Sequence, residues 1–211
     1  MKSYGQRCPL ARALDLIGER WTFLVVRELL LGPRRYTDLL DGLPGVGTNI
    51  LAARLATLQS AGLVAKRTLP APTAVTVYEL TDAGRALRPT VRALSEWGEQ
   101  HGAPVTDDQT VRPGWILSSV ARRGARLHDG RSCELWVGSD VFELTAADGE
   151  LSVAARRAAS PDAIVTMRPD VFYALATQRT TPRAAGERVA VEGDPSVATG
   201  VLDALSGAAS A

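Results

Sequence analysis

The chain has 211 residues, of which 45% are hydrophobic, and its 24 Lys and Arg oppose 23 Asp and Glu. This length suits one large domain or two small ones, and the apolar content indicates a globular chain rather than a disordered one. No apolar run reaches the roughly 20 residues that a membrane span needs, and the N-terminus lacks the apolar stretch of a secretory signal. Two widely separated cysteines, Cys8 and Cys133, fit reduced thiols. We therefore expect a cytoplasmic protein with no membrane partner.

The charge is divided unevenly along the chain. Residues 1–104 hold 13 basic and 9 acidic residues, a net charge of +4, whereas residues 105–211 hold 11 and 14, a net charge of −3. The stretch HGAPVTDDQTVRPG between the halves has two prolines, two glycines and no apolar periodicity. We predict two domains, 1–104 and 105–211, with different partners and a linker at about residues 101–113.

The first half is predicted to be mostly helical, because its apolar residues recur three and four positions apart. The expected helices are residues 8–17, 21–31, about 37–40 and 48–60. Two runs rich in β-branched residues, 63–69 and 75–80, flank a proline-containing loop and predict an antiparallel hairpin. A last helix should begin at Thr81-Asp82, be interrupted at Pro89 and continue to about His101.

This order of elements on a basic background is that of a winged helix-turn-helix. The motifs are CPLARALDLIGERWTFLVVRELLLGPRRYTDLLDGLPGVGTNILAARLATLQSAGLVAKR, then YELTDAG, then Trp97-Gly98. With these motifs in this order, residues of about 5–100 resemble the HxlR family of bacterial transcriptional regulators. The resemblance implies a dimeric winged-helix protein whose partners are double-stranded DNA and a second copy of the chain.

The predicted helix 48–60 would then be the recognition helix, with its leucines facing inward and its first turns near base edges. The candidate base contacts on its other face are Thr48, Asn49 and Arg54. Asn49 can read adenine, and Arg54 can reach guanine or phosphate. The alternative is that Thr48 or Asn49 merely caps the helix and that Arg54 is a surface charge.

Phosphate contacts need only charge and hydrogen-bond donors. The candidates lie just before the short helix at about residues 37–40 and on the hairpin: Arg34, Arg35, Lys66, Arg67 and Thr73. Each could instead be a solvated surface residue. Because the recognition helix has a single basic residue, we expect the affinity for DNA to come largely from these flanking groups.

Two further features of the first half suggest interactions. The apolar residues spaced along the last helix are Leu87, Val91, Leu94 and Trp97, and they predict a twofold interface formed together with the first helix. Cys8 stands at the start of the first helix beside Arg7, surroundings that favour a reactive thiolate. In HxlR-like regulators a cysteine at this place is typical and in some members senses oxidants, so Cys8 is a redox-sensing candidate; the alternative is an inert thiol.

The second half is predicted to form an α+β layer, with strands first and helices after. The expected strands are residues 115–120, 133–137, 141–145, 151–155, 163–167 and 189–191, and the expected helices are 169–177, 182–185 and 195–205. The segments ELWVGSDVFELTAADGELSV and DAIVTMRPDVFYALATQRTTPRAAGERVAVEGDPS resemble a sterol-carrier-protein-like lipid-binding domain over about residues 115–205. The fold class expected for the whole chain is thus α+β: a winged helix-turn-helix followed by a sterol-carrier-like domain.

That second resemblance implies a hydrophobic tunnel between sheet and helices, and hence an apolar small molecule as a possible effector. The candidate lining residues are Trp115, Trp136, Phe142, Leu144, Phe172, Tyr173, Leu175 and Leu202. The same apolar residues could equally form a closed core that serves stability or dimerisation. Cys133, on a predicted strand, is expected in that core.

No arrangement of catalytic residues, metal ligands or cofactor-binding residues is evident, so we expect a protein that is not an enzyme and holds no metal or cofactor. The interpretation is a homodimeric regulator that binds a pseudo-palindromic operator and responds to an apolar molecule or to oxidation of Cys8. The alternatives are a carrier of lipids or other hydrophobic ligands whose helical half does not bind DNA, and an enzyme acting on an acyl substrate.

Overall fold

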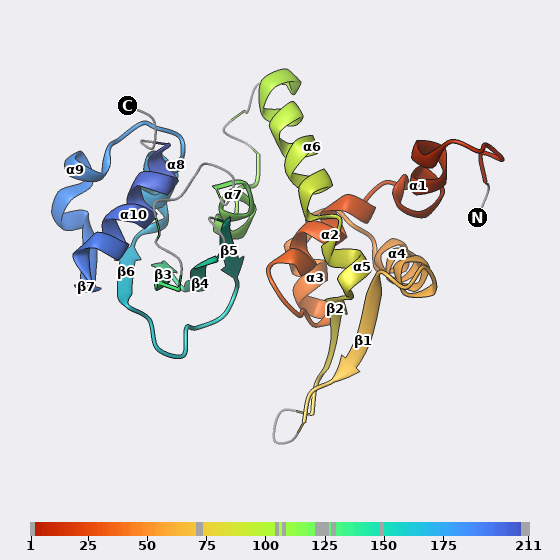
Figure 1. Cartoon of the computed structure of the whole chain (residues 1–211), viewed down its shortest axis with the longest axis horizontal. Coiled ribbons are helices and arrows are strands. Elements are labelled where there is room, and N and C mark those ends of the chain that lie inside the picture. Colours follow the sequence, from red (N-terminus) through yellow and green to blue (C-terminus); the bar gives the residue numbers. More distant parts are fainter. Residues whose placement is uncertain are drawn as a thin grey trace. The chain divides into compact units, whose positions relative to one another are not determined.

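The computed structural model describes residues 3–70, 74–103, 106, 109–120, 127, 130–147 and 150–207. The chain divides into two compact units, Met1–Thr106 and Asp107–Ala211 (Figure 1). Within the ranges that the structure describes, no helix is both long enough and apolar enough to cross a membrane.

The first unit consists of helices around a two-stranded hairpin, the winged helix-turn-helix expected from the sequence. Its elements are α1 (Pro9–Ile17), α2 (Thr22–Leu30), α3 (Tyr36–Gly42), α4 (Thr48–Ser60), β1 (Val64–Thr68), β2 (Thr76–Leu80), α5 (Asp82–Arg85) and α6 (Arg88–His101). The interruption expected at Pro89 is the break between α5 and α6. Thr81 caps α5 by accepting a hydrogen bond from the Gly84 amide, and Pro89 lies in the first turn of α6, where an N–H is not needed.

One hydrophobic core holds this unit together and fixes the direction of α4. The side chains that α2 and α4 bury in it are Val25, Val26, Leu29, Leu30, Leu51, Leu55 and Leu58. Because the three leucines of α4 lie on one face, the opposite face of the helix is left in solvent.

The second unit is a five-stranded sheet covered by helices. Its elements are α7 (Pro113–Val120), β3 (Ser132–Val137), β4 (Asp140–Ala147), β5 (Glu150–Ala154), β6 (Ala163–Met167), α8 (Pro169–Ala176), α9 (Pro182–Ala185), a 3-10 turn (Gly186–Arg188), β7 (Val189–Gly193) and α10 (Pro195–Ser206). The strand order is β5-β4-β3-β6-β7, with β3 and β6 parallel and the other pairs antiparallel.

Residues 115–120, predicted as a strand, are helical, and that prediction is wrong. An apolar run this short cannot be assigned to strand or helix by periodicity alone. Pro113 decides the matter, since α7 begins at this residue and proline is favoured in the first turn of a helix.

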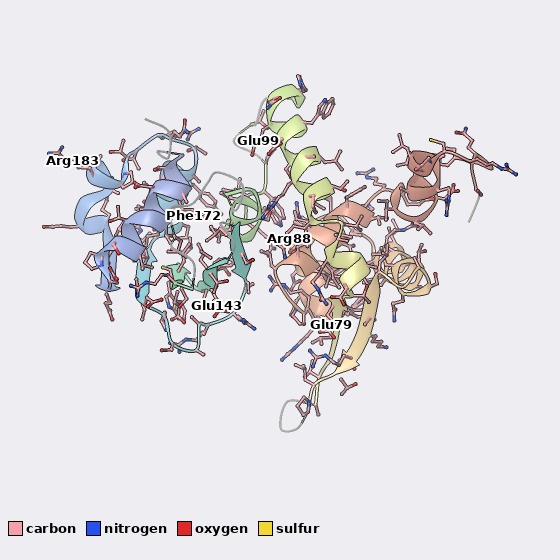
Figure 2. All side chains as sticks on the ribbon, viewed as in Figure 1. Glu79, Arg88, Glu99, Glu143, Phe172 and Arg183 are labelled. Atoms are coloured by element: carbon pink, nitrogen blue, oxygen red, sulfur yellow. The ribbon has the colours of Figure 1, made fainter. Side chains whose placement is uncertain are left out.

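Side chains alternate between the two faces of the sheet. Cys133 and Leu135 of β3 pair with Leu144 and Phe142 of β4, and all four are buried on the face that α10 covers, with α8 packed against α10. Burial raises the pKa of the Cys133 thiol to about 12, so this thiol stays protonated in the core, as expected for a structural cysteine. Phe172 of α8 is fully buried in the same layer (Figure 2).

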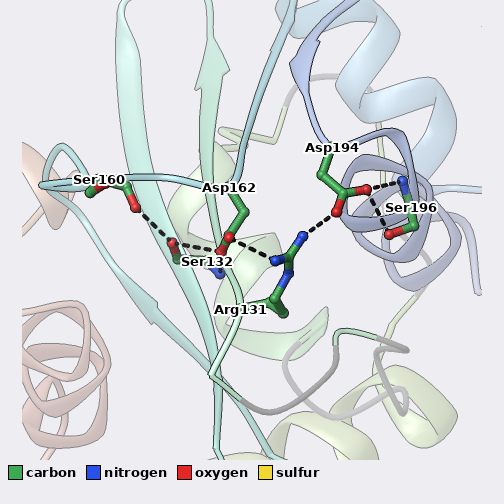
Figure 3. A network of polar contacts seen from close by, with 6 residues as sticks. All are labelled: Arg131, Ser132, Ser160, Asp162, Asp194 and Ser196. Carbon is green, nitrogen blue, oxygen red and sulfur yellow. Dashed lines mark hydrogen bonds and ion pairs between the residues drawn. The ribbon is translucent and has the colours of Figure 1, made fainter.

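One arginine joins the starts of three elements in the second unit (Figure 3). Arg131, just before β3, forms ion pairs with Asp162, before β6, and with Asp194, which caps α10. The other Asp162 oxygen accepts a hydrogen bond from the Ser132 amide at 2.8 Å. These contacts hold β3, β6 and α10 in register at one end of the sheet.

The outer face of the sheet carries a buried carboxylate. Glu134 accepts hydrogen bonds from the Trp136 indole at 2.8 Å and the Ala158 amide at 2.9 Å, and it pairs with Arg157 at 3.5 Å. Burial acts to raise the pKa of the Glu134 carboxyl, but these hydrogen bonds and the arginine outweigh it and hold the pKa below its usual value. The loop after β5 is thereby fastened to β3.

Replacing this carboxylate should destabilise the second unit. Glu134→Ala leaves the Trp136 indole and the Ala158 amide without their acceptor, which should cost about 1–3 kcal/mol of unfolding free energy in urea titrations. Glu134→Gln keeps an acceptor oxygen and should lose less. Because the folded-state pKa is lowered, the contribution should be complete at neutral pH and disappear as the pH falls through that pKa. Equal losses for both variants would contradict this role.

Candidate nucleic-acid interface

Helix α4 is anchored at its start by α3. The Tyr36 hydroxyl donates a hydrogen bond of 2.7 Å to the Thr48 carbonyl, joining the first residues of the two helices. The connection between them passes through Gly45, whose φ of +85° is in the left-handed region that favours glycine. With its leucines buried on one side, α4 is held at both its start and its inner face.

Thr48 and Asn49 do not cap this helix. The N-cap residue is Gly47, and no side chain provides a capping hydrogen bond. Both side chains are exposed, and neither has a hydrogen-bond partner within the part of the chain that the structure describes. The alternative role as helix caps is therefore wrong, and both side chains are available for an external partner.

Arg54 is placed differently from the expectation of a free residue on the outer face. Its side chain is 19% exposed and lies on Glu19, in the connection between α1 and α2, with 3.5 Å between Nη1 and Oε2. Its Nε is buried and has no hydrogen-bond partner among the described residues. The structure thus turns the one basic side chain of α4 toward its own unit.

Three residues share one face of the hairpin. Arg34 exchanges two backbone hydrogen bonds with Tyr78, at 2.9 and 2.7 Å, and Lys66 stands opposite the same tyrosine in the β1–β2 ladder. Residues opposite each other in a ladder lie on the same face. The Lys66 ammonium is 6.0 Å from the centre of the Tyr78 ring, and Arg34 is joined to Tyr78 through its backbone.

Arg67 is on the other face of the hairpin. Its guanidinium binds both oxygens of Glu79, at 3.0 and 2.9 Å (Figure 2 labels Glu79). The hydrogen bond from Arg67 lowers the pKa of the Glu79 carboxyl, so the pair stays ionised and its charges cancel. Arg35 is exposed at the N-cap of α3, while Thr73 lies outside the described residues.

Sequence reasoning missed three residues of this surface: Tyr36, Tyr78 and Glu19. A period-two alternation along β1 already separates Lys66 from Arg67, so that distinction was available from the sequence. The Glu19–Arg54 pair joins residues far apart in the chain and leaves no local spacing signal.

The candidate dimer residues divide into two sets. Leu87 and Val91 pack against the core of their own unit, whereas Leu94 and Trp97 are 49% and 61% exposed. The ring of Trp97 lies 5.4 Å from that of His101, one helical turn further along α6.

Cys8 is exposed at the N-cap of α1, beside a groove that Tyr4, Leu10 and Leu14 also line. The groove is open and mostly apolar in its lining residues. A redox role for Cys8 stays a prediction.

The candidate ligand residues of the second unit do not line one cavity. Trp136 lies on the outer face of the sheet with Glu134, opposite to Phe142 and Leu144, because successive residues of a strand point to opposite sides. The fully buried members, such as Phe172 and Leu175, belong to the core of the unit. The remaining half-buried members on the helical side of the sheet are Trp115, Tyr173 and Leu202.

Among the described residues, no cluster of His, Cys, Asp and Glu could hold a metal ion.

The comparisons with known proteins agree with this division. Residues 16–106 match the HxlR-like helix-turn-helix family, and residues 132–206 match the SCP-2 sterol transfer family. An uncharacterised HTH-type transcriptional regulator of Synechocystis is 38% identical over 100 residues, which cover 46% of this chain and 74% of that protein. The HTH-type transcriptional regulator YodB of Bacillus subtilis is 31% identical over 98 residues, which cover 46% of this chain and 88% of YodB.

Among solved structures, the reduced form of YodB from Bacillus subtilis superposes with a TM-score of 0.42 and 29% identity, over 48% of this chain and 100% of that one. Both resemblances drawn from the sequence are confirmed by the family matches. The second unit matches the SCP-2 sterol transfer family over residues 132–206, and through its first unit the chain belongs to the HxlR-like helix-turn-helix family of transcriptional regulators.

Proposed function

We propose that this protein regulates transcription by binding operator DNA, with α4 in the major groove and the β1–β2 hairpin against the backbone. The observation that carries the proposal is the exposed, uncapped start of α4, where the side chains of Thr48 and Asn49 have no hydrogen-bond partner among the described residues. In helix-turn-helix proteins the first residues of the recognition helix contact base edges. The family membership of the first unit supports the same assignment.

Affinity then comes from the cations beside the helix. Arg34 and Lys66 share one face of the hairpin, and Arg35 is exposed at the start of α3. Neutralising phosphates with such cations releases counterions and makes binding salt-dependent. Arg67 contributes no net charge, because Glu79 neutralises it. The carrier alternative, in which the helical half does not bind DNA, requires that no duplex be retained in a gel-shift assay with the DNA upstream of the gene.

The salt dependence of operator binding should show that Lys66 contacts phosphate and that Arg67 does not. If Arg34, Arg35 and Lys66 each contact one phosphate in both subunits of a dimer, the slope of log K against log salt should be about −5. Lys66→Ala should flatten this slope by about two. The charge-neutral control Arg67→Gln/Glu79→Gln should leave it unchanged, as measured by fluorescence anisotropy. Equal slopes for all three proteins would contradict the assignment of phosphate contacts to this face.

We also propose that the protein binds as a homodimer through α6 and α1. Leu94 and Trp97 are exposed on α6, and Leu10 and Leu14 of α1 are 66% and 37% exposed. Apolar side chains of this size are normally hidden in an interface when they recur at helical spacing. A twofold arrangement would set two recognition helices about 34 Å apart, one turn of DNA.

Trp97→Asp should disrupt this dimer, because a carboxylate would have to be buried without a partner. We expect a monomer in sedimentation analysis and weak operator binding, whereas Trp97→Phe should remain a dimer. A wild-type protein that sediments as a monomer both alone and on DNA would disprove the proposed interface.

The second unit is proposed to bind an apolar effector on the helical side of its sheet, where Trp115, Tyr173 and Leu202 are half-buried. The match to the SCP-2 sterol transfer family supports this ligand class. Tyr173 donates a hydrogen bond to the Val111 carbonyl at 3.1 Å and thereby ties α8 to the segment before α7. An apolar ligand entering there would contact aromatic side chains already fixed in place.

A long-chain or polycyclic apolar compound should therefore raise the melting temperature of the full chain, because it binds the folded state alone. It should also change operator affinity about 5- to 150-fold if the two DNA-binding states differ in affinity for it. The measurement is a thermal-shift screen followed by titration with operator present. If no apolar compound shifts the melting temperature, the second unit is a structural or dimerising module.

A further inference from the structure

The outward face of the recognition helix is made of short, uncharged side chains. The exposed residues between the start of α4 and Ala56 are Thr48, Asn49, Ile50, Ala52, Ala53 and Ala56. Leu51, Leu55 and Leu58 are 0–2% exposed on the opposite face, so the rotation of the helix about its axis is fixed. Three of these six side chains are therefore single methyl groups, and none of the six is charged.

This face of α4 has no Arg or Lys side chain that could recognise guanine. Bidentate recognition of guanine O6 and N7 uses Arg or Lys, and Arg54 is the one basic residue in the sequence of α4. Its side chain is engaged by Glu19 and its Nε is buried, so it is turned away from the face that carries the alanines. The hairpin cations Arg34 and Lys66 are placed for phosphates, which carry no sequence information.

Asn49 and alanine methyls match the features of an A·T pair in the major groove. Asparagine pairs with adenine N6 and N7, and an apolar group such as the alanine methyl contacts the thymine C5-methyl. Alanine also leaves the helix narrow, so its backbone can enter deeply into a groove about 12 Å wide. Contact between an alanine methyl and a thymine C5-methyl removes apolar surface from water and needs no hydrogen bond.

We infer that α4 selects A·T pairs at the centre of each operator half-site, with Asn49 reading one adenine and Ala52, Ala53 and Ala56 reading thymines through their C5-methyl groups. This inference rests on the proposed DNA-binding function and specifies its sequence preference. Specificity then arises mainly from apolar contact, while affinity arises from the cations beside the helix.

The test uses the full chain and a pool of duplexes with a random central segment, followed by sequencing of the bound fraction. The selected half-sites should have A·T pairs where α4 lies. Uracil in place of one of these thymines removes the methyl and keeps all hydrogen bonds. Each replacement should weaken binding about fourfold, the factor that corresponds to about 0.8 kcal/mol for one buried carbon group. Uracil outside the half-sites is the control and should have no effect.

Two variants assign the contacts to side chains. Ala53→Gly should abolish the thymine-over-uracil preference at the pair that Ala53 faces and leave it at the other pairs. Because this preference compares two duplexes on one protein, any change in helix stability cancels. Asn49→Ala should reduce discrimination for adenine at one position by roughly 5- to 150-fold.

The outcomes separate this inference from the function on which it rests. If the pool yields no bound duplex, both fail. If duplexes are selected but have G·C pairs at the half-site centres, or bind uracil and thymine equally, the protein binds DNA and the assignment to thymine methyls is overturned. Selection of A·T centres with uracil sensitivity that Ala53→Gly removes at one pair supports it.

Discussion

The packing of three leucines on one side of α4 is the constraint on which the first unit depends. Leu51, Leu55 and Leu58 fit against α2 and exclude water from the centre of the unit. Burying such side chains stabilises the fold by roughly 1.5–3 kcal/mol each. The same contacts decide which residues of the helix meet solvent, so the core determines which side chains α4 presents to a partner.

In the second unit the sheet decides which side chains are buried, as helix α4 does in the first unit. Strand alternation directs Cys133 and Leu135 to the helices and Glu134 and Trp136 to the other side. The inner face is uniformly apolar, and the outer face holds a carboxylate that is buried because a loop with Arg157 covers it. Polar contacts at Arg131 and Glu134 thus fix connections, while apolar contacts fill the interior.

Most of the architecture follows from local patterns in the sequence. The spacing of the leucines predicts α4, and the β-branched runs around a proline-containing loop predict the hairpin. The six residues 115–120, four of them apolar, fit a strand or a helix equally well, so their pattern alone does not predict α7. For the site, the exposure of Asn49 could be predicted, but the engagement of Arg54 by Glu19 could not, since that contact exists only after α1, α2 and α4 have packed.

The Glu19–Arg54 pair has a mechanical consequence. Glu19 lies in the short connection between α1 and α2, and α1 itself packs against α4. The recognition helix is therefore joined to the start of the chain twice, by this pair and by the packing of α1 on α4. Separating Glu19 from α4 would leave the partly buried Arg54 guanidinium without its carboxylate. The exposed Cys8 thiol and the leucines of α1 thus belong to the element that this pair connects to the recognition helix.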